Sequence, residues 1–272
     1  MPRSSASASS ITGWSCTASP STAIARSGTQ SSTLFAAARI AGLLLLTLVC
    51  VPLHLATRLL FRRSGWPPRF LGAAGWICGA RLQVIGSKPG AHSLLVCNHV
   101  SWLDILVMGG ATGCAFVSKD RLGGPVAHWL ADQNHTLYIR RDQRRNALNQ
   151  ADSIARRLQG RQPLALFPEG TTSDGKQLLP FRSTLFSAVA PAPEGVKVRP
   201  VAIDYGEAAS EIGWGDEPGK DNVLRVLGRI RSTSVTIWIL EPIASADRKT
   251  LAHCARAAIA DALTSSRAAA AL

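Results

Sequence analysis

The chain has 272 residues, 46% of them hydrophobic, and its 30 lysines and arginines outnumber its 17 acids, which gives a formal net charge of +13. The first acidic residue is Asp104, so all the basic residues before it are unopposed. Such a basic half indicates an anionic partner, either a nucleic acid or a phospholipid surface, and argues against a cationic one.

The N-terminal part of the chain divides into two regions. Residues 1–33 are rich in serine, threonine and alanine without periodicity, which predicts a disordered extension. Residues 34–82 are predicted to form a membrane-associated helical region. Its apolar run, Ile40 to Ala56, carries no charge and is followed at once by arginines. Nucleic-acid binders have little use for such a run, so we expect a membrane as the partner and no nucleic acid.

The apolar run leaves the mode of membrane attachment open. Its length is at the short end for a membrane-spanning helix, and Pro52 and His54 interrupt it. A helix lying in the membrane interface is nearly as compatible, and a buried core helix is the third alternative. More arginines follow the run than precede it, so the positive-inside rule places the large C-terminal part on the cytoplasmic face of the cell inner membrane.

Residues 83–272 are predicted to form an α/β domain. Short apolar runs that predict strands lie at 93–97, 114–118, 136–139, 163–167, 198–203 and 234–240. Helical patterns lie between them, the clearest over residues 143–159. Strands alternating with helices predict a mostly parallel central sheet flanked by helices. Sites in such sheets gather at the carboxyl ends of the strands.

His99 and Asp104 follow the first of these strands, in the sequence "NHVSWLDI". On one continuous helix they would lie about 140° apart, so they can meet only if His99 precedes the helix and Asp104 lies in its first turns. Ser101 is a candidate N-cap that would start the helix there. The carboxylate would then orient the imidazole as a general base. The alternative is a polar turn residue beside an aspartate that complements the helix dipole.

A second polar turn follows the strand at 163–167. In "LFPEGTTSDG" it offers a carboxylate at Glu169, a glycine that a substrate can approach at Gly170, and the hydroxyls of Thr171 and Thr172. An ordinary turn is the alternative. Two such turns at strand ends of one domain favour a site.

These two blocks, in this order and about 70 residues apart, resemble those of the 1-acylglycerol-3-phosphate type of glycerolipid acyltransferases. "LYIRRD" at 137–142 and "VRPVAI" at 198–203 resemble two weaker blocks, and the likeness covers about residues 83–242. It implies a membrane-bound O-acyltransferase that moves a fatty acyl group to the free hydroxyl of a lysolipid. The donor would be acyl-CoA or acyl-carrier protein, as co-substrate, with no further cofactor and no metal.

The resemblance also implies roles for particular residues. His99 would be the general base and Asp104 would hold and polarise it, without a covalent intermediate. Lys119 and Arg141 would help hold the acceptor. Glu169, Gly170 and Thr171 would complete its binding site.

The expected acceptor is 1-acyl-sn-glycerol-3-phosphate, giving phosphatidate, but one position departs from the family pattern. Many members carry an arginine where this chain has Thr172, and threonine cannot bind phosphate as an arginine fork does. Lyso-ornithine lipid or another lysophospholipid is therefore the alternative acceptor. A non-catalytic protein that binds lipid at the membrane surface is the alternative of another class.

Overall fold

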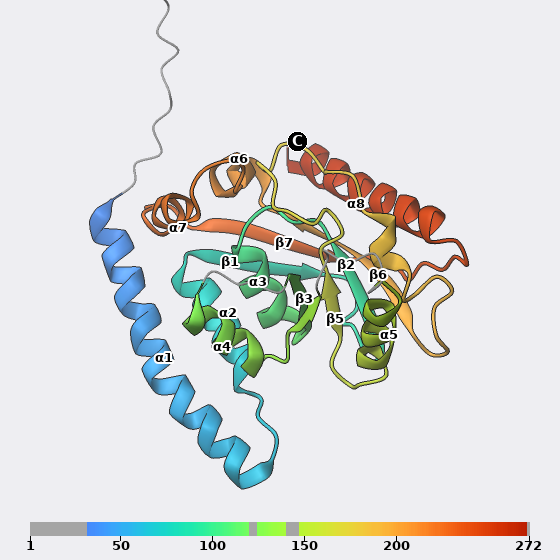
Figure 1. Ribbon diagram of the computed structural model, residues 1–272. Coiled ribbons are helices and arrows are strands. Elements are labelled where there is room, and N and C mark those ends of the chain that lie inside the picture. The colour runs from blue at the N-terminus through green and yellow to red at the C-terminus, as the bar shows by residue number, and fades with distance from the viewer. Residues whose placement is uncertain (1–31, 120–123, 140–146, 271–272) are drawn as a thin grey trace, which may run out of the picture.

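The computed structural model describes residues 32–119, 124–139 and 147–270. Its centre is a seven-stranded sheet in the order β1-β7-β6-β2-β5-β3-β4 (Figure 1). The strands are β1 Ala80–Ile85, β2 Ser93–Cys97, β3 Ala115–Lys119, β4 Leu137–Ile139, β5 Leu164–Leu166, β6 Lys197–Asp204 and β7 Thr233–Ile239. The helices are α1 Thr33–Phe61, α2 Trp66–Ile77, α3 Leu103–Thr112, α4 Pro125–Gln133, α5 Ala147–Leu158, α6 Ala209–Ile212, α7 Gly219–Leu227 and α8 Arg248–Ala270, with short 3-10 turns at Ser183–Phe186 and Gly206–Ala208. Neighbouring strands run parallel except β6 and β7, which confirms the predicted fold class.

Helices cover both faces of the sheet. Strand β2 is buried throughout, and its residues alternate between two hydrophobic clusters. Leu95 and Cys97 pack with residues of α3 and α7, whereas Leu94 and Val96 pack with residues of α5 and α8. A strand buried on both faces is a continuous apolar run, which is why "SLLVC" was recognisable in the sequence.

Each of the six apolar runs overlaps a strand, but the sheet also holds one strand that the sequence did not reveal. Strand β1 lies in the region assigned to membrane-associated helices and pairs in parallel with β7, with Ala80 opposite Thr233. It is an edge strand whose Leu82 and Val84 are exposed, so it does not have the pattern of apolar residues that indicates a buried strand. Its partner lies about 150 residues further along the chain. The α/β domain therefore begins at Ala80 rather than at residue 83.

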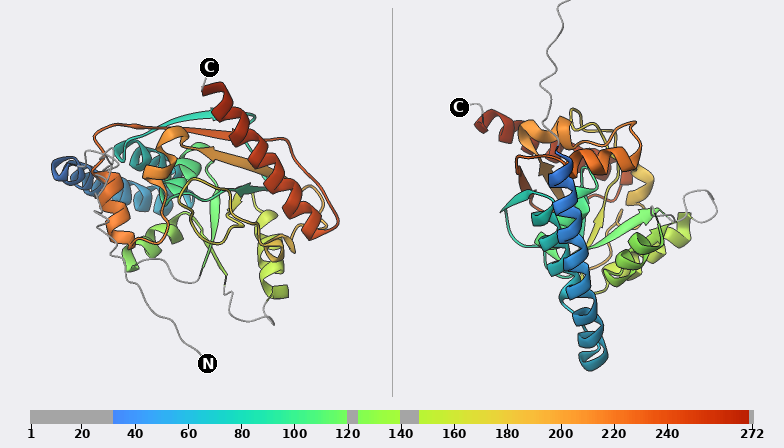
Figure 2. Two further views of the ribbon diagram at one scale, coloured as in Figure 1. Left: turned by 90° about the horizontal axis from the view of Figure 1, so that it is seen from above. Right: turned by 90° about the vertical axis from the view of Figure 1, so that its left-hand side faces the viewer.

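Helix α1 packs against the domain along one narrow seam. Ala36, Cys50 and His54 are buried on that seam, while most of its leucines are exposed. The guanidinium of Arg39 donates to the carbonyl of Leu227 at the end of α7, at 2.9 Å. The helix is long and apolar enough to cross a membrane, and only 11% of its most apolar window is buried. The alternative of a buried core helix is therefore wrong, as α1 lies along the side of the molecule (Figure 2).

Helices α2 and α3 touch through their backbones. A Cβ atom added at Gly110 of α3 would lie 2.5 Å from the Cα atom of Gly72 of α2. One added at Gly109 would lie 2.3 Å from a methyl group of Leu71. The Leu71 methyl group could turn aside, but the backbone of Gly72 could not, so the glycine at position 110 is what allows this close crossing. Helix α2 is thereby joined directly to α3, the helix that carries Asp104 in its first turn.

Candidate active site

The structure brings His99 and Asp104 together in the way the spacing predicted. Strand β2 ends at Cys97, and the chain turns through His99 before α3 begins at Leu103. The Nδ1 atom of His99 lies 2.8 Å from Oδ2 of Asp104. The carboxylate is fully buried and the imidazole is 18% exposed. A partly exposed base held by a buried acid can reach a substrate while its partner stays dry.

Asp104 accepts hydrogen bonds from four donors. Besides His99 Nδ1, its Oδ2 atom accepts the backbone N–H groups of Val100 at 2.7 Å and Ser101 at 2.9 Å. Its Oδ1 atom accepts the hydroxyl of Tyr205 at 2.6 Å. A buried carboxylate is stable only when it is satisfied in this way. The same arrangement holds the turn that carries His99 against the first turn of α3.

This arrangement fixes the protonation pattern of the imidazole. Because Asp104 acts as an acceptor towards two backbone N–H groups, the Nδ1 atom of His99 must be the donor in their contact. The Nε2 atom of the neutral ring is then left with its lone pair, as a general base requires. Phe167 stacks on the imidazole, with ring centroids 4.1 Å apart, and Phe116 stacks behind Phe167. The ring therefore has an apolar wall on one side.

Ser101 does not cap α3 as predicted. The N-cap residue is Trp102, without a side-chain capping bond, and the Ser101 hydroxyl is 3.4 Å from the N–H of Leu103, a weak contact. The carboxylate of Asp104 reaches back to the N–H groups of Val100 and Ser101 instead. It holds the chain before the helix in the way that a serine cap was expected to.

Two further side chains fix the turn to neighbouring strands. Asn98 donates to the carbonyl of Ile203 at 2.9 Å and accepts its N–H at 2.7 Å, which joins the turn to β6. Glu169, after β5, accepts the N–H of His99 at 2.7 Å and that of Leu179 at 3.1 Å. The turn that carries the imidazole is thus tied to strands on both sides of β2.

Glu169 is buried, and burial raises the pKa of its carboxyl group to about 7, even though both backbone N–H groups favour the charged form. The resemblance implied that Glu169 helps to bind the acceptor. With both oxygens bonded to backbone N–H groups, its geometry favours a positioning role for the turn of His99 instead.

The structure describes some of the remaining predicted site residues in full and others in part or not at all. Gly170 follows Glu169, is buried and has a φ angle of 77°, a conformation that favours glycine. Thr171 is exposed and Thr172 half-buried in the same loop. Lys119 is the last residue of β3, but the structure does not describe its side chain. Arg141 lies outside the described residues.

Reasoning from the sequence missed the roles of Asn98 and Tyr205. Asn98 stands beside His99 in the first block, which was a usable signal. Tyr205 directly follows β6, and a sequence pattern cannot show that its hydroxyl reaches a carboxylate 101 positions earlier in the chain.

Comparison with known proteins identifies the family. The acyltransferase family model matches residues 81–204. The chain is 34% identical to a lyso-ornithine lipid O-acyltransferase of Rhodobacter capsulatus, over 76% of this chain and 82% of that protein. This chain belongs to the acyltransferase family.

Other relatives agree with that assignment. A lyso-ornithine lipid O-acyltransferase of Pseudomonas aeruginosa is 38% identical, over 67% of this chain and 73% of its own length. A 1-acyl-sn-glycerol-3-phosphate acyltransferase of Neisseria gonorrhoeae is 36% identical over 41% of this chain and 44% of its own. The fold matches the crystal structure of a Thermotoga maritima 1-acyl-sn-glycerophosphate acyltransferase, with a TM-score of 0.62 and 18% identity, over 85% of this chain and 95% of that one.

Proposed function

We propose that the protein transfers a fatty acyl group from an acyl thioester to the free hydroxyl of a lysolipid, with His99 as the general base. The observation that carries the proposal is the contact between the partly exposed imidazole and the buried carboxylate of Asp104. It supplies a neutral base with a fixed tautomer at the carboxyl end of a parallel strand.

The reaction follows from this geometry in two proton transfers. The Nε2 atom of His99 takes the proton of the acceptor hydroxyl, and the oxygen attacks the thioester carbonyl. The new C–O bond forms, the C–S bond breaks, and the imidazolium returns its proton to the departing thiolate. Asp104 stabilises the imidazolium between these steps.

A direct transfer needs no acyl-enzyme. The nucleophilic side chains nearest to His99 in the chain are Cys97 and Ser101, each two residues away, and both are fully buried. Burial also raises the pKa of the Cys97 thiol well above its usual value, which keeps it protonated. Neither side chain is in a position to carry an acyl group from a substrate at the imidazole.

For the acceptor, lyso-ornithine lipid is the first candidate and 1-acyl-sn-glycerol-3-phosphate the second. The relatives that match most of their own length are lyso-ornithine lipid O-acyltransferases. An ornithine headgroup carries a carboxylate and an ammonium group and no phosphate. The half-buried Thr172, in place of the family's arginine, suits such an acceptor better than a phosphate.

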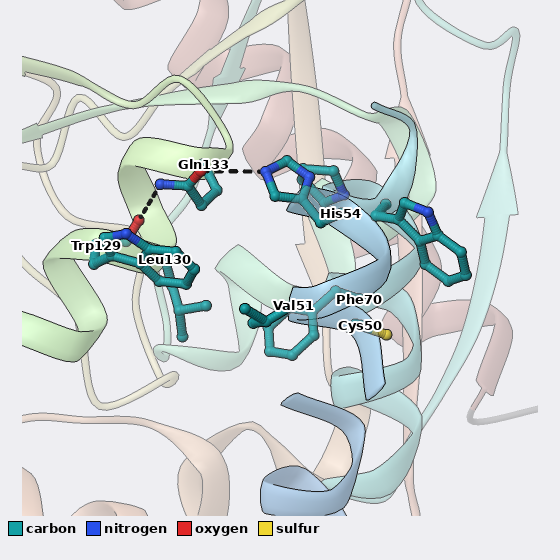
Figure 3. Close-up of a pocket in the computed structure, with 9 residues that line it drawn as sticks. Cys50, Val51, His54, Phe70, Trp129, Leu130 and Gln133 are labelled. Atoms are coloured by element: carbon teal, nitrogen blue, oxygen red, sulfur yellow. Dashed lines mark hydrogen bonds between the residues drawn. The ribbon is translucent and has the colours of Figure 1, made fainter. Parts of the chain in front are cut away.

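We further propose that α1 lies in the membrane interface and does not cross the bilayer. The helix is tied to the α/β domain near both ends. Next to its first turn, the N–H of Ser32 donates to the carbonyl of Gly228 at 2.9 Å. Near its last turn, the imidazole of His54 lies 3.2 Å from the side-chain oxygen of Gln133 on α4 (Figure 3). The guanidinium of Arg58 donates to the same oxygen, at 3.0 Å.

These ties span about 39 Å of helix, more than the roughly 30 Å of a hydrocarbon core. A helix crossing the bilayer would carry α4 or α7 into the lipid with it. Lying in the interface, α1 can bury its exposed leucines in the membrane while the arginines at its end reach the headgroups. The domain would then sit on the cytoplasmic face of the inner membrane.

Acyl transfer by the purified full-length chain tests the catalytic proposal. The assay compares lyso-ornithine lipid with 1-acyl-sn-glycerol-3-phosphate, each with acyl-CoA and with acyl-carrier protein. His99→Ala should abolish transfer, whereas His253→Ala, at an exposed position on α8, should not. A higher kcat/KM for the phosphate-bearing acceptor would reverse the order of the acceptors. Normal turnover by His99→Ala would refute the mechanism, and lipid binding without any transfer would favour the non-catalytic alternative.

Labelling of an introduced cysteine tests the orientation of α1, since Cys50, Cys78, Cys97 and Cys114 are buried. Thr33→Cys and Arg62→Cys are each placed in a chain whose Cys16 and Cys254 are replaced by serine, in sealed inverted membrane vesicles. An impermeant maleimide should label both positions from the outside if α1 lies in the cytoplasmic interface. Labelling of only one of the two would show that the helix crosses the bilayer.

A further inference from the structure

The oxygen of Asp104 that does not face His99 is bonded to Tyr205. Its Oδ1 atom lies 2.6 Å from the Tyr205 hydroxyl, whereas the Oδ2 atom faces the imidazole and two backbone N–H groups. Both side chains in this contact are buried, with Tyr205 at 2% and Asp104 at 0% exposure. A hydrogen bond between a neutral donor and a buried carboxylate is short and strong.

Tyr205 is held in place by the sheet itself. It directly follows β6, whose last residue, Asp204, is opposite Thr236 of β7. The side chain of Asn98 makes two hydrogen bonds to the backbone of Ile203 in β6, two residues before Tyr205. Asn98 therefore aligns the strand that delivers the phenol with the turn that delivers the imidazole.

We infer that Tyr205 is a positioning residue of the active site, completing a chain from its hydroxyl through Asp104 to His99. The inference rests on the proposed function, because it assigns Tyr205 an effect on catalysis through the general base. Its hydroxyl fixes the rotation of the carboxylate, so that Oδ2 stays directed at Nδ1. It also withdraws charge from the carboxylate, which limits how strongly Asp104 stabilises the imidazolium.

Burial and the nearby carboxylate raise the pKa of Tyr205 well above its usual value, so the phenol remains a donor at every pH of an assay. The other titratable groups of the described residues that interact with Asp104 are His99, Glu169 and the thiol of Cys97. Cys97 stays protonated, for the reason given above. A change in the pH profile on altering Tyr205 therefore has to be separated only from the titration of Glu169.

The first test is Tyr205→Phe, which keeps the ring and removes the donor. Loss of one charge-assisted hydrogen bond should lower kcat about tenfold to a hundredfold. The apparent KM for the acyl donor should stay the same. The acid limb of the kcat/KM profile should move to higher pH, by about half a unit or more, because the carboxylate then stabilises the imidazolium more strongly. Tyr138→Phe, which removes the other tyrosine hydroxyl of the chain, is the matched control and should change neither quantity.

The second test keeps the hydroxyl of Tyr205 and changes only its strength as a donor. The chain has two tyrosines, so in Tyr138→Phe protein Tyr205 is the one that remains, and growth on 3-fluorotyrosine labels it alone. Fluorine makes the phenol a stronger donor, so the acid limb should move to lower pH, opposite to its direction in Tyr205→Phe. This measurement tests the effect of the Tyr205 hydroxyl on the pH profile even if Tyr205→Phe accumulates poorly. If Glu169 caused the shift, the fluorinated protein carrying Glu169→Gln would show none.

A double-mutant comparison separates the two proposals. If Tyr205 acts through Asp104, Tyr205→Phe should cost little further activity in an Asp104→Asn protein. The inference on Tyr205 is wrong if Tyr205→Phe and the fluorinated protein both keep the wild-type rate and pH profile while His99→Ala is inactive. If His99→Ala is active, the proposed mechanism itself fails, whatever the tyrosine variants do.

Discussion

Glu169→Gln offers a test of the site that does not depend on knowing the substrate. In the folded protein, burial raises the pKa of Glu169 from 4.5 to about 7. The folded state therefore holds the proton more tightly than the unfolded chain, and the free energy of unfolding falls as the pH rises from 4.5 towards 7. With these two pKa values, the free energy of unfolding falls by about 2.5 kcal/mol between pH 5 and pH 8. A glutamine at this position cannot titrate and should not show this loss.

The measurement is urea unfolding in detergent micelles at several pH values, for the wild type and Glu169→Gln. The difference between the two free energies of unfolding should change by about 2.5 kcal/mol in favour of glutamine from pH 5 to pH 8. Glu207→Gln, at an exposed position, should leave the difference flat. A change of the opposite sign would mean that the N–H groups of His99 and Leu179 outweigh burial, and would refute this account of the carboxylate.

Three further predictions concern catalysis, packing and the acceptor. Asp104→Asn should lower kcat by about a thousandfold or more with the protein still bound to membranes, since the imidazole loses its orientation; unchanged kcat in the same assay would contradict this. Gly110→Ala should lower the free energy of unfolding by about 1–3 kcal/mol, because its methyl group would overlap Gly72, and a neutral result would mean that α2 and α3 can separate freely. Lys119→Ala should raise the KM for 1-acyl-sn-glycerol-3-phosphate about tenfold and leave the KM for lyso-ornithine lipid unchanged. Thr172→Arg should lower the KM for the phosphate-bearing acceptor alone. Equal effects of either variant on both acceptors would refute a phosphate-contacting role for that position.

The features that the sequence revealed are those in which neighbouring residues carry the information. Strand β2 is buried on both faces and forms an unbroken apolar run, so its position and the polar turn after it could be predicted. The spacing of His99 and Asp104 likewise predicted that they meet only at the start of a helix, and they do.

Features that depend on distant partners could not be predicted. Strand β1 is defined by its pairing with β7, and most of its residues are exposed, so its pattern resembled the end of an apolar helix. The hydroxyl of Tyr205 and the carboxylate of Glu169 reach the turn of His99 only because β6 and β5 flank β2. That strand order is a property of the whole sheet and leaves no local trace in the sequence.

The glycine crossing between α2 and α3 has a consequence for how the protein meets a lipid. Because the two backbones touch at Gly72 and Gly110, the imidazole has a fixed height relative to α2, and α2 in turn packs at Ile77 against Gly42 of α1, the helix that we place in the membrane interface. The reach of the catalytic base along the membrane normal is then set by backbone contact and not by a flexible linker. A lysolipid anchored in the same leaflet presents its hydroxyl at a depth determined by its own headgroup. Acceptors would accordingly be sorted by that depth before any side chain recognises their chemistry, and moving the hydroxyl by one methylene along the lipid should alter kcat/KM even where the headgroup is unchanged.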